Sequence, residues 1–199
     1  MAKNPVVLVH GITDRNTIFQ EMSNYLTNLG WSVHSINLSP NDGSEKLEAL
    51  AVQVARYIDQ VFLKDQFVDL VGFSMGGLVT RYYLQRLGGI NRVQRYISIS
   101  APNHGTVTAY SLAYEGVLEM RPHSEFLEDL ERDSTDCLGK INCTTIWTPF
   151  DLMIVPPESS RIVTSKQFQV PVLVHAWMVK DARVLELVKE ALLEPIRTD

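Results

Sequence analysis

Short apolar runs alternate along the chain with helical patterns, and this alternation is typical of a parallel β-sheet wrapped by helices. The first run, Val6 to Val9, is apolar on both faces, as a central parallel strand needs to be. Later runs predict five more strands, over residues 31–36, 67–73, 93–99, 143–148 and 170–174. The pattern therefore predicts an α/β fold with about six mostly parallel strands.

The helices are predicted from apolar residues that recur every 3.6 positions. Ser44 is expected to cap the clearest of them, whose apolar stripe comprises Leu47, Leu50, Ala51, Val54, Ile58, Val61 and Phe62. An earlier helix is expected near Thr17, with Gln20 at capping-box spacing and Gly30 at its end. Further helices are predicted over residues 75–87 and 124–132, and after Asp181.

Residues 101–140 form the least regular part of the pattern. Within them, residues 107–120 are apolar enough to border a binding site. The sequence leaves two interpretations of this segment open, a short lid or an ordinary packed helix.

Length and composition predict a single domain over residues 1–199 and argue against several classes of function. A chain of 199 residues with 45% hydrophobic residues can bury a core without metal or disulfide support. Its net charge of −5, without a basic run, argues against a nucleic-acid partner. No apolar run could span a bilayer, and the chain opens on a strand pattern instead of a signal peptide, so we expect a cytoplasmic protein. Cys137 and Cys143 are interpreted as reduced thiols, with a disulfide as the alternative and no metal site.

Candidate chemistry begins at residues 72–76, which fit the pattern G-x-S-x-G around Ser74. The motif alone is a weak signal, but here its serine lies where a predicted strand ends and a helix begins. Such a sharp turn lifts the hydroxyl to the carboxyl edge of the sheet, beside the positive end of the helix. Ser74 is therefore predicted to be a nucleophile.

A nucleophilic serine needs a base, and the base needs an acid to orient it. His175 is the predicted base, because it follows the sixth predicted strand at the same sheet edge as Ser74. The other histidines precede the serine or lie near the irregular segment: His10, His34, His104 and His123. Asp151, after the fifth predicted strand, is the predicted acid. Its competitors lie in loops or helical segments and are interpreted as solvated charges: Glu158, Asp133 and Asp136.

The remaining parts of a hydrolase site can also be assigned. The backbone amides of Met75 and Ile12 are predicted to bind the oxyanion, with Gly11 allowing close approach and His10 serving structure. An apolar acyl pocket is predicted from side chains near the strand ends, with substrate-binding candidates Phe73, Trp147, Phe150, Met153 and Trp177.

These residues carry a family resemblance. Residues 5–12 and 72–77 resemble the small bacterial lipases and esterases of the α/β-hydrolase superfamily, as do the acid loop from Asp151 to Val155 and His175. Residues 101–106 resemble a family loop that usually reads Pro-His-His-Gly-Thr, except that Asn103 replaces one histidine. The resemblance implies a minimal α/β-hydrolase fold with helices on both faces, no large cap domain, and a Ser-Asp-His triad without metal or cofactor.

The expected function is hydrolysis of a carboxylic ester. The expected partner is a small-molecule or lipid ester, and a transient contact with a lipid surface fits this substrate. On the same fold, an acyl thioesterase or an acyltransferase is the alternative. A binding protein that keeps the fold without catalysis is the hypothesis from another class.

Overall fold

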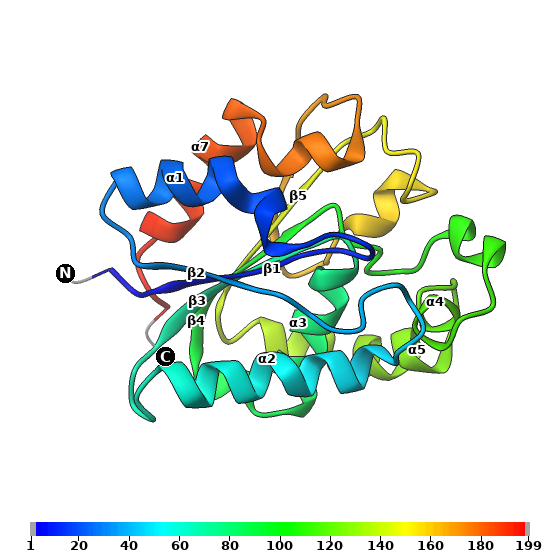
Figure 1. Ribbon diagram of the computed structural model, residues 1–199, viewed down its shortest axis with the longest axis horizontal. Coiled ribbons are helices and arrows are strands. Elements are labelled where there is room, and N and C mark those ends of the chain that lie inside the picture. Colours follow the sequence, from blue (N-terminus) through cyan, green and yellow to red (C-terminus); the bar gives the residue numbers. More distant parts are fainter. Residues whose placement is uncertain (1–2, 198–199) are drawn as a thin grey trace.

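Six parallel strands form one sheet, in the order β2-β1-β3-β4-β5-β6 (Figure 1). The structure is a computed structural model that describes residues 3–197. The strands are β1 (Val6–Val9), β2 (Val33–Ile36), β3 (Val68–Phe73), β4 (Val93–Ile99), β5 (Asn142–Trp147) and β6 (Lys166–Gln169). The predicted α/β class and parallel sheet are confirmed.

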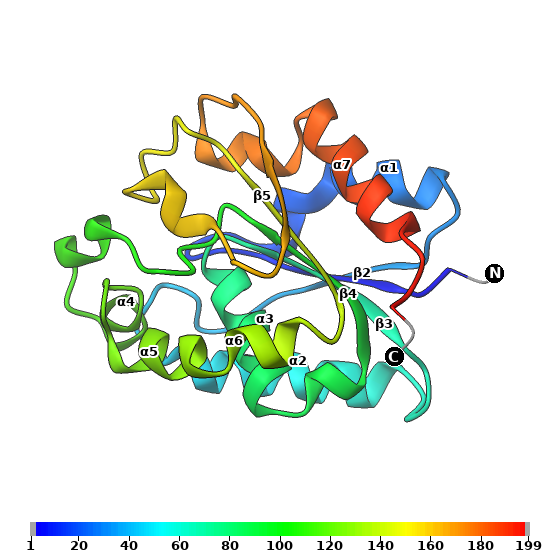
Figure 2. The ribbon, with the colours of Figure 1, turned by 180° about the vertical axis from the view of Figure 1, so that it is seen from behind.

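Helices cover both faces of the sheet. Helices α1 and α7 lie on one face, and α2, α3, α5 and α6 lie on the other (Figures 1 and 2). The helices are α1 (Gln20–Asn28), α2 (Leu47–Val61), α3 (Met75–Arg86), α4 (Glu115–Glu119), α5 (Glu125–Arg132), α6 (Ser134–Leu138) and α7 (Ala182–Leu193). No helix among residues 3–197 is both long and apolar enough to cross a membrane.

Strand alternation divides the interior into two apolar cores. In β1, Val7 and Val9 face the core beneath α2 and α3, whereas Val6 and Leu8 face the core beneath α1 and α7. All four side chains are fully buried. The sheet is thus apolar on both faces, as the first run of the sequence predicted.

The last strand lies earlier than predicted. Residues 166–169 form β6, whereas the sequence predicted a strand over residues 170–174. Two valines of the predicted run, Val170 and Val172, are buried in the core beneath α7. The run is therefore apolar because it packs in the core, and not because it pairs with a neighbouring strand. Pro171 between the two valines has no N–H to donate. The true strand has three polar residues of four and none that is fully buried, because it forms the edge of the sheet.

Two predicted helix caps are also wrong. Thr17 lies inside a short 3₁₀ turn (Asn16–Phe19) ahead of α1, and the start of α1 carries no side-chain cap. Ser44 bonds to Asp42, while the first amide of α2, Leu47 N–H, donates to the Glu119 carboxylate of α4 at 2.7 Å. The predicted cap at Asp181 is confirmed, and Ser124, where a helix was predicted to begin, caps α5. Val61, predicted in the buried stripe of α2, is 44% exposed.

The chain order of the strands creates a crevice at one edge of the sheet. From β1 the chain crosses to β2 on one side, and from β3 it crosses to β4 on the other. The loops after these two neighbouring strands therefore diverge, and ligands of α/β sheets bind where this happens. Ile12 follows β1 and Ser74 follows β3, so both lie at this point.

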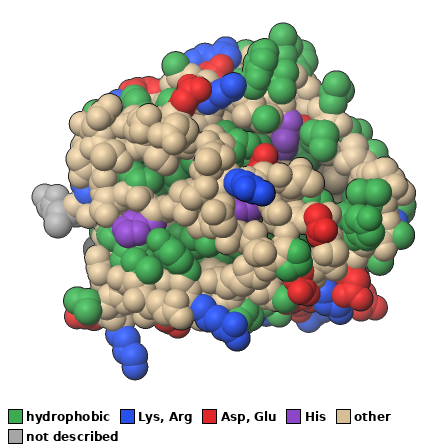
Figure 3. Space-filling model, in the orientation of Figure 1, with side chains coloured by type: hydrophobic (Ala, Val, Ile, Leu, Met, Phe, Trp, Pro, Cys, Tyr) green, Lys and Arg blue, Asp and Glu red, His purple; other side chains and the backbone are tan. Residues whose placement is uncertain are grey.

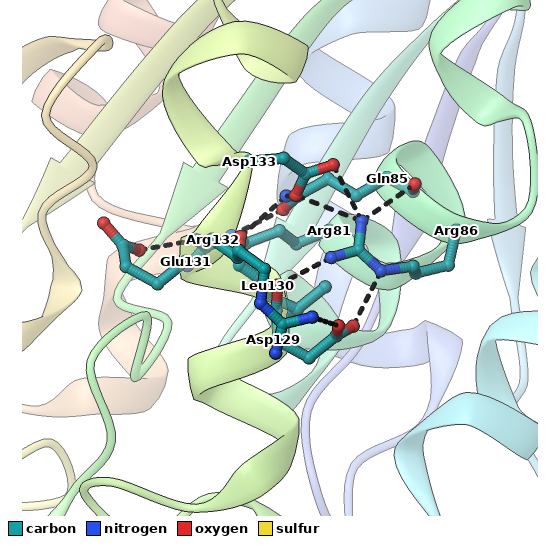
Figure 4. A network of polar contacts seen from close by, with 8 residues as sticks. All are labelled: Arg81, Gln85, Arg86, Asp129, Leu130, Glu131, Arg132 and Asp133. Atoms are coloured by element: carbon teal, nitrogen blue, oxygen red, sulfur yellow. Dashed lines mark hydrogen bonds and ion pairs between the residues drawn. The ribbon is translucent and has the colours of Figure 1, made fainter.

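A polar network fastens α5 to α3, although α3 is mostly buried (Figure 4). The Arg81 side chain is fully buried and donates to the carbonyls of Asn103 and Leu130 and to the Glu131 carboxylate. Arg86 bridges Asp129 and Asp133 on the same side. The network therefore holds α5, which lies in the irregular segment 101–140, against α3.

We expect Arg81→Met to lower the free energy of unfolding by about 2–5 kcal/mol, because the Asn103 carbonyl loses its Arg81 donor and the Glu131 carboxylate loses its charged partner. Arg132→Met is the matched control, since Arg132 is 74% exposed and among residues 3–197 pairs with Asp129 alone. Its cost should stay within about 0.5 kcal/mol. Urea denaturation measures both values, and equal losses would show that the buried network contributes no particular stability.

Glu119 should make stability depend on pH. Burial, and then the neighbouring Glu48, raises the Glu119 pKa to about 7. The folded protein therefore holds this proton more tightly than the unfolded chain, and wild-type stability falls as pH rises from about 4.5 through about 7. Glu119→Gln should gain stability relative to wild type at pH 8, on the order of 1–2 kcal/mol, and not at pH 4. Glu115→Gln, on the exposed side of α4, should show no such difference.

Candidate active site

Ser74 occupies the turn between β3 and α3 in a strained conformation, with φ of 55° and ψ of −129°. The flanking glycines leave room for this turn. A Cβ on Gly72 would lie 2.6 Å from the Gly77 Cα, and one on Gly76 would lie 2.3 Å from the Val9 carbonyl oxygen. Non-glycine residues with positive φ persist only where surrounding structure enforces them, and such positions cluster at active sites.

His175 and Asp151 form a hydrogen-bonded pair. His175 Nδ1 lies 2.8 Å from Asp151 Oδ2 and 3.0 Å from Oδ1. Asp151 is 3% exposed, and its Oδ1 also accepts the backbone N–H groups of Met153 and Ile154. The carboxylate is thereby fixed in one orientation, and an Nδ1–H donated to it leaves Nε2 as the basic nitrogen.

Two further side chains hold this pair in place: Thr148, which no sequence pattern singled out, and Phe73, which was predicted to bind substrate. The Thr148 hydroxyl donates to the Val172 carbonyl and accepts the N–H of Phe150, so it ties the acid loop to the segment before His175. The Phe73 ring lies 4.9 Å from the His175 imidazole, centroid to centroid. A threonine directly after a strand and before the acid was the signal available in the sequence.

The structure brings Ser74 and His175 together at one cavity of about 430 Å³, which both residues line. His175 Nε2 is buried and has no hydrogen-bond partner among residues 3–197. A basic nitrogen left without a partner beside a serine is placed to accept its proton. Asp151 thus contacts His175, and His175 shares a cavity with Ser74 without a hydrogen bond between the two side chains.

Two backbone N–H groups next to Ser74 and Gly11 in sequence, those of Met75 and Ile12, are without an acceptor in the described secondary structure and loops. Met75 opens α3, so its N–H has no acceptor within the helix. The N–H of Ile12 has no acceptor among the described residues, whereas the next amide, Thr13, donates to Asn41. The buried His10 ring supports this loop, since Nδ1 contacts the Gly11 carbonyl and Nε2 accepts the Leu38 N–H. Burial lowers the His10 pKa, consistent with a neutral structural ring.

A second cavity, of about 250 Å³, meets the first at Ser74. It lies beneath residues 107–120, and its apolar lining includes Ala109, Leu112, Val117, Met120 and Ile154. The two cavities also share Ile12, Thr13 and Met153.

The segment 107–120 is packed against the body of the protein. Gly116 N–H donates to the Gly43 carbonyl, and a Cβ on Gly116 would lie 2.3 Å from the Glu45 carbonyl oxygen. Val117 and Met120 are buried, whereas Tyr110 and Tyr114 are exposed. The segment therefore roofs the second cavity while remaining bonded to the loop before α2.

Most of the predicted pocket residues lie elsewhere. Met153 lines both cavities, but four others line neither: Phe73, Trp147, Phe150 and Trp177. Phe73 and Trp147 are buried in or beside the sheet, so they support the site from beneath. Phe150 and Trp177 are about half exposed. Positions at strand ends were predicted correctly, but the direction of each side chain was not fixed by the sequence.

The competing acids and histidines lie away from this pair. Asp133 binds Arg86 and Gln85, and Glu158 lines a separate hollow with His104. Both cysteines are free, Cys143 being buried. Within residues 3–197 no group of three or more potential ligands could hold a metal ion.

One ionisable residue of the first cavity was not predicted. Asp14 lies two residues beyond Ile12 and lines the cavity together with His175. Burial raises its pKa, opposed by the nearby His10 and His175. No sequence motif singled it out, because a polar residue after a turn is ordinary.

Comparison with known proteins adds a family to this geometry. Residues 5–150, most of the chain, match the family described as palmitoyl protein thioesterase. The chain belongs to this family. The matched span contains Ser74, Ile12 and Met75, and it ends just before Asp151.

Curated relatives of this thioesterase-family chain include the lysosomal thioesterase PPT2 of Homo sapiens, 35% identical over 107 residues, and that of Mus musculus, 34% identical over 107 residues. Each match covers 51% of this chain and 34% of the relative, so the alignment spans about a third of the relatives' length. The name of these relatives places them in lysosomes; the cytoplasmic location expected for this chain remains a prediction.

Solved structures similar to the chain confirm the α/β-hydrolase fold. The mature lipase BlEst2 of Bacillus licheniformis has a TM-score of 0.77 and 18% identity, covering 96% of this chain and 92% of that one. Lipase B of Aspergillus fumigatus has a TM-score of 0.79 and 20% identity, covering 99% and 54%. The resemblance to small bacterial lipases is borne out at the level of fold, and the described residues form no separate cap domain.

Gly11 should be essential for activity without being essential for folding. A Cβ at this position would lie 2.9 Å from the Ser74 Cβ and 3.3 Å from its Oγ. We expect Gly11→Ala to lower kcat by about 100-fold toward any hydrolysed ester, because it displaces the serine or the oxyanion loop.

The control for Gly11→Ala is Gly88→Ala, where an added Cβ meets nothing within 4 Å. That change should cost about 1 kcal/mol in unfolding, since φ is +77°, and leave kcat unchanged. Equal kcat values for the two variants would contradict the close approach at Ser74.

Proposed function

We propose that this protein hydrolyses acyl thioesters and esters by a serine mechanism, with Ser74 as nucleophile, His175 as base and Asp151 as the orienting acid. The observation that carries the proposal is the 2.8 Å contact between His175 Nδ1 and Asp151, with the unpartnered Nε2 at the cavity that Ser74 lines. Family membership supports the acyl substrate, and the geometry supports the mechanism.

In the first half-reaction, Ser74 Oγ attacks the acyl carbon while His175 Nε2 takes its proton. The carbonyl oxygen becomes an oxyanion, which the amides of Ile12 and Met75 stabilise beside the N-terminus of α3. His175 then gives its proton to the departing sulfur or oxygen, and the acyl-serine forms. Water, activated by the same histidine, releases the carboxylic acid in the second half-reaction.

The two cavities suggest how the substrate lies. His175 must reach the leaving atom in order to protonate it, and it lines only the larger cavity. The leaving group therefore departs through the larger cavity, and the acyl chain occupies the apolar cavity beneath residues 107–120. Ala109, Val117 and Met120 then form its wall.

Thioester hydrolysis is the first candidate reaction, because the family and the curated relatives are both described as thioesterases. Carboxylic-ester hydrolysis on lipids, the activity expected from the sequence, is the second candidate. Apolar side chains exposed around the cavities favour it, including Leu152 at 81% and Leu173 at 67%. Figure 3 shows such side chains gathered at the end of the molecule where α4 lies. They would suit transient contact with a lipid surface.

The decisive experiment compares two octanoyl compounds, the thioester of 2-mercaptoethanol and the matched oxygen ester of ethylene glycol. Wild type should hydrolyse the thioester, and the ratio of kcat/KM values ranks the two candidates. Ser74→Ala should abolish both activities while the protein still folds. Full activity in this variant would remove Ser74 from the mechanism.

Asp151→Asn should lower kcat by about 10⁴-fold with little change in KM, because an amide neither fixes the histidine tautomer nor stabilises the imidazolium. Glu158→Gln is the matched control and should retain full activity, since Glu158 is exposed and lines a separate hollow. If the Glu158 change is the damaging one, the acid has been assigned wrongly.

A further inference from the structure

We propose that Asp14 selects leaving groups by the charge they carry next to the scissile bond, favouring cationic groups over anionic ones. The inference rests on the proposed function, and it concerns a residue on the leaving-group side of the cleft that no sequence motif singled out. Four observations support it.

The first observation is where Asp14 lies. It lines the larger cavity with His175 and does not line the smaller one. Since the general acid must touch the leaving atom, the cavity that His175 lines is the one the leaving group enters. Asp14 is therefore on the leaving-group side, away from the acyl chain.

The second observation is its distance from the nucleophile. A Cβ built on Gly11 would lie 3.1 Å from Asp14 Oδ2 and 3.3 Å from Ser74 Oγ. Two oxygens that close to one point are separated by at most about two hydrogen-bond lengths. A charged group within two or three bonds of the scissile bond would thus lie well inside one screening length of the carboxylate.

The third observation is the rigidity of the loop that carries Asp14. Its N–H donates to the Gly11 carbonyl, the Thr13 N–H donates to the Asn41 carbonyl at 2.7 Å, and the Asn41 side chain donates to the Asp14 carbonyl. Thr13 has a positive φ of 60°, so the turn is fixed by these contacts. These contacts hold the Asp14 backbone at the wall of the larger cavity, which the residue lines.

The fourth observation is the absence of a compensating cation. Apart from Asp14, the ionisable residues lining the two cavities are His175 in the larger one and Asp42 in the smaller one. Asp14 makes no ion pair within residues 3–197. Arg15 lines neither of these cavities, although it and Asp14 both border a neighbouring hollow. An unpaired carboxylate in a cleft with apolar walls attracts cations and repels anions.

The test uses three octanoyl thioesters whose thiols share a two-carbon spacer: thiocholine (cationic), 2-mercaptoethanol (neutral) and 2-mercaptoethanesulfonate (anionic). Thiol release gives kcat/KM for each at pH 8 and low salt. The three thioesters differ in intrinsic reactivity, so each enzyme is described by one ratio, kcat/KM for the thiocholine ester over kcat/KM for the sulfonate ester. The measured quantity is this ratio in wild type divided by the same ratio in Asp14→Asn. We expect this quotient to be about 10 or more.

Asp42→Asn is the matched control, because Asp42 lines the smaller cavity and bonds only within its own turn, to Ser44. It should leave the ratio within about twofold of wild type. If Asp14→Asn does not fold, the wild-type ratio measured from 20 to 500 mM NaCl replaces it, and it should fall steeply as salt screens the carboxylate.

The outcomes separate the two proposals. Hydrolysis of all three thioesters with a ratio that neither Asp14→Asn nor salt changes would overturn the role of Asp14 and leave the proposed function standing. If Asp42→Asn changed the ratio as much as Asp14→Asn does, the role of Asp14 would also be overturned, because the effect would then follow the net charge of the protein and not the position of Asp14. Failure of wild type to cleave the neutral thioester would contradict the proposed function itself.

Discussion

The first turn of α3 lies so close to the end of β1 that only glycine fits at position 76. A side chain there would collide with the carbonyl oxygens of Val9 and His10, at 2.3 and 2.4 Å from its Cβ. This approach brings the loop after β1, which contains Gly11 and Ile12, against the serine turn. The strained φ of Ser74 and the absence of a side chain at Gly11 are consequences of the same crowding.

The other half of the site is built by the last third of the chain. Asp151 and His175 come from different loops, and Thr148 joins these loops through its hydroxyl while Phe73 supports the imidazole from the sheet. The family match stops at residue 150, so it covers the nucleophile and oxyanion half. The proposed assignment of base and acid therefore depends on the contact between His175 and Asp151, because both residues lie outside the matched span.

In the proposed mechanism, the two cavities that share Ser74 hold different parts of the substrate, the acyl chain in one and the leaving group in the other. The roof of the smaller cavity is the irregular segment 107–120, held down by Gly116 and by the Glu119 carboxylate at the start of α2. The larger cavity is more polar, because Asp14 and His175 line it. Different residues would then select the length of the acyl chain and the charge of the leaving group. Substitutions in one cavity could change one preference without altering the nucleophile.

The sequence was enough to predict the parallel sheet, the turn at Ser74 and the sheet edge that carries Ser74, Asp151 and His175. Runs that are apolar on both faces identify parallel strands, and β1 and β4 were predicted to the residue; carboxyl ends of parallel strands share one edge, so Ser74, Asp151 and His175 could be grouped there. It misplaced β6, because core valines beside Pro171 resemble a strand more than the polar edge segment does. It also misassigned Phe73, Trp147, Phe150 and Trp177 to the pocket, and it passed over Asp14, Thr148 and the Glu119 cap of α2. These depend on side-chain direction and on contacts between distant segments, such as Glu119 with Leu47, and only tertiary packing decides them.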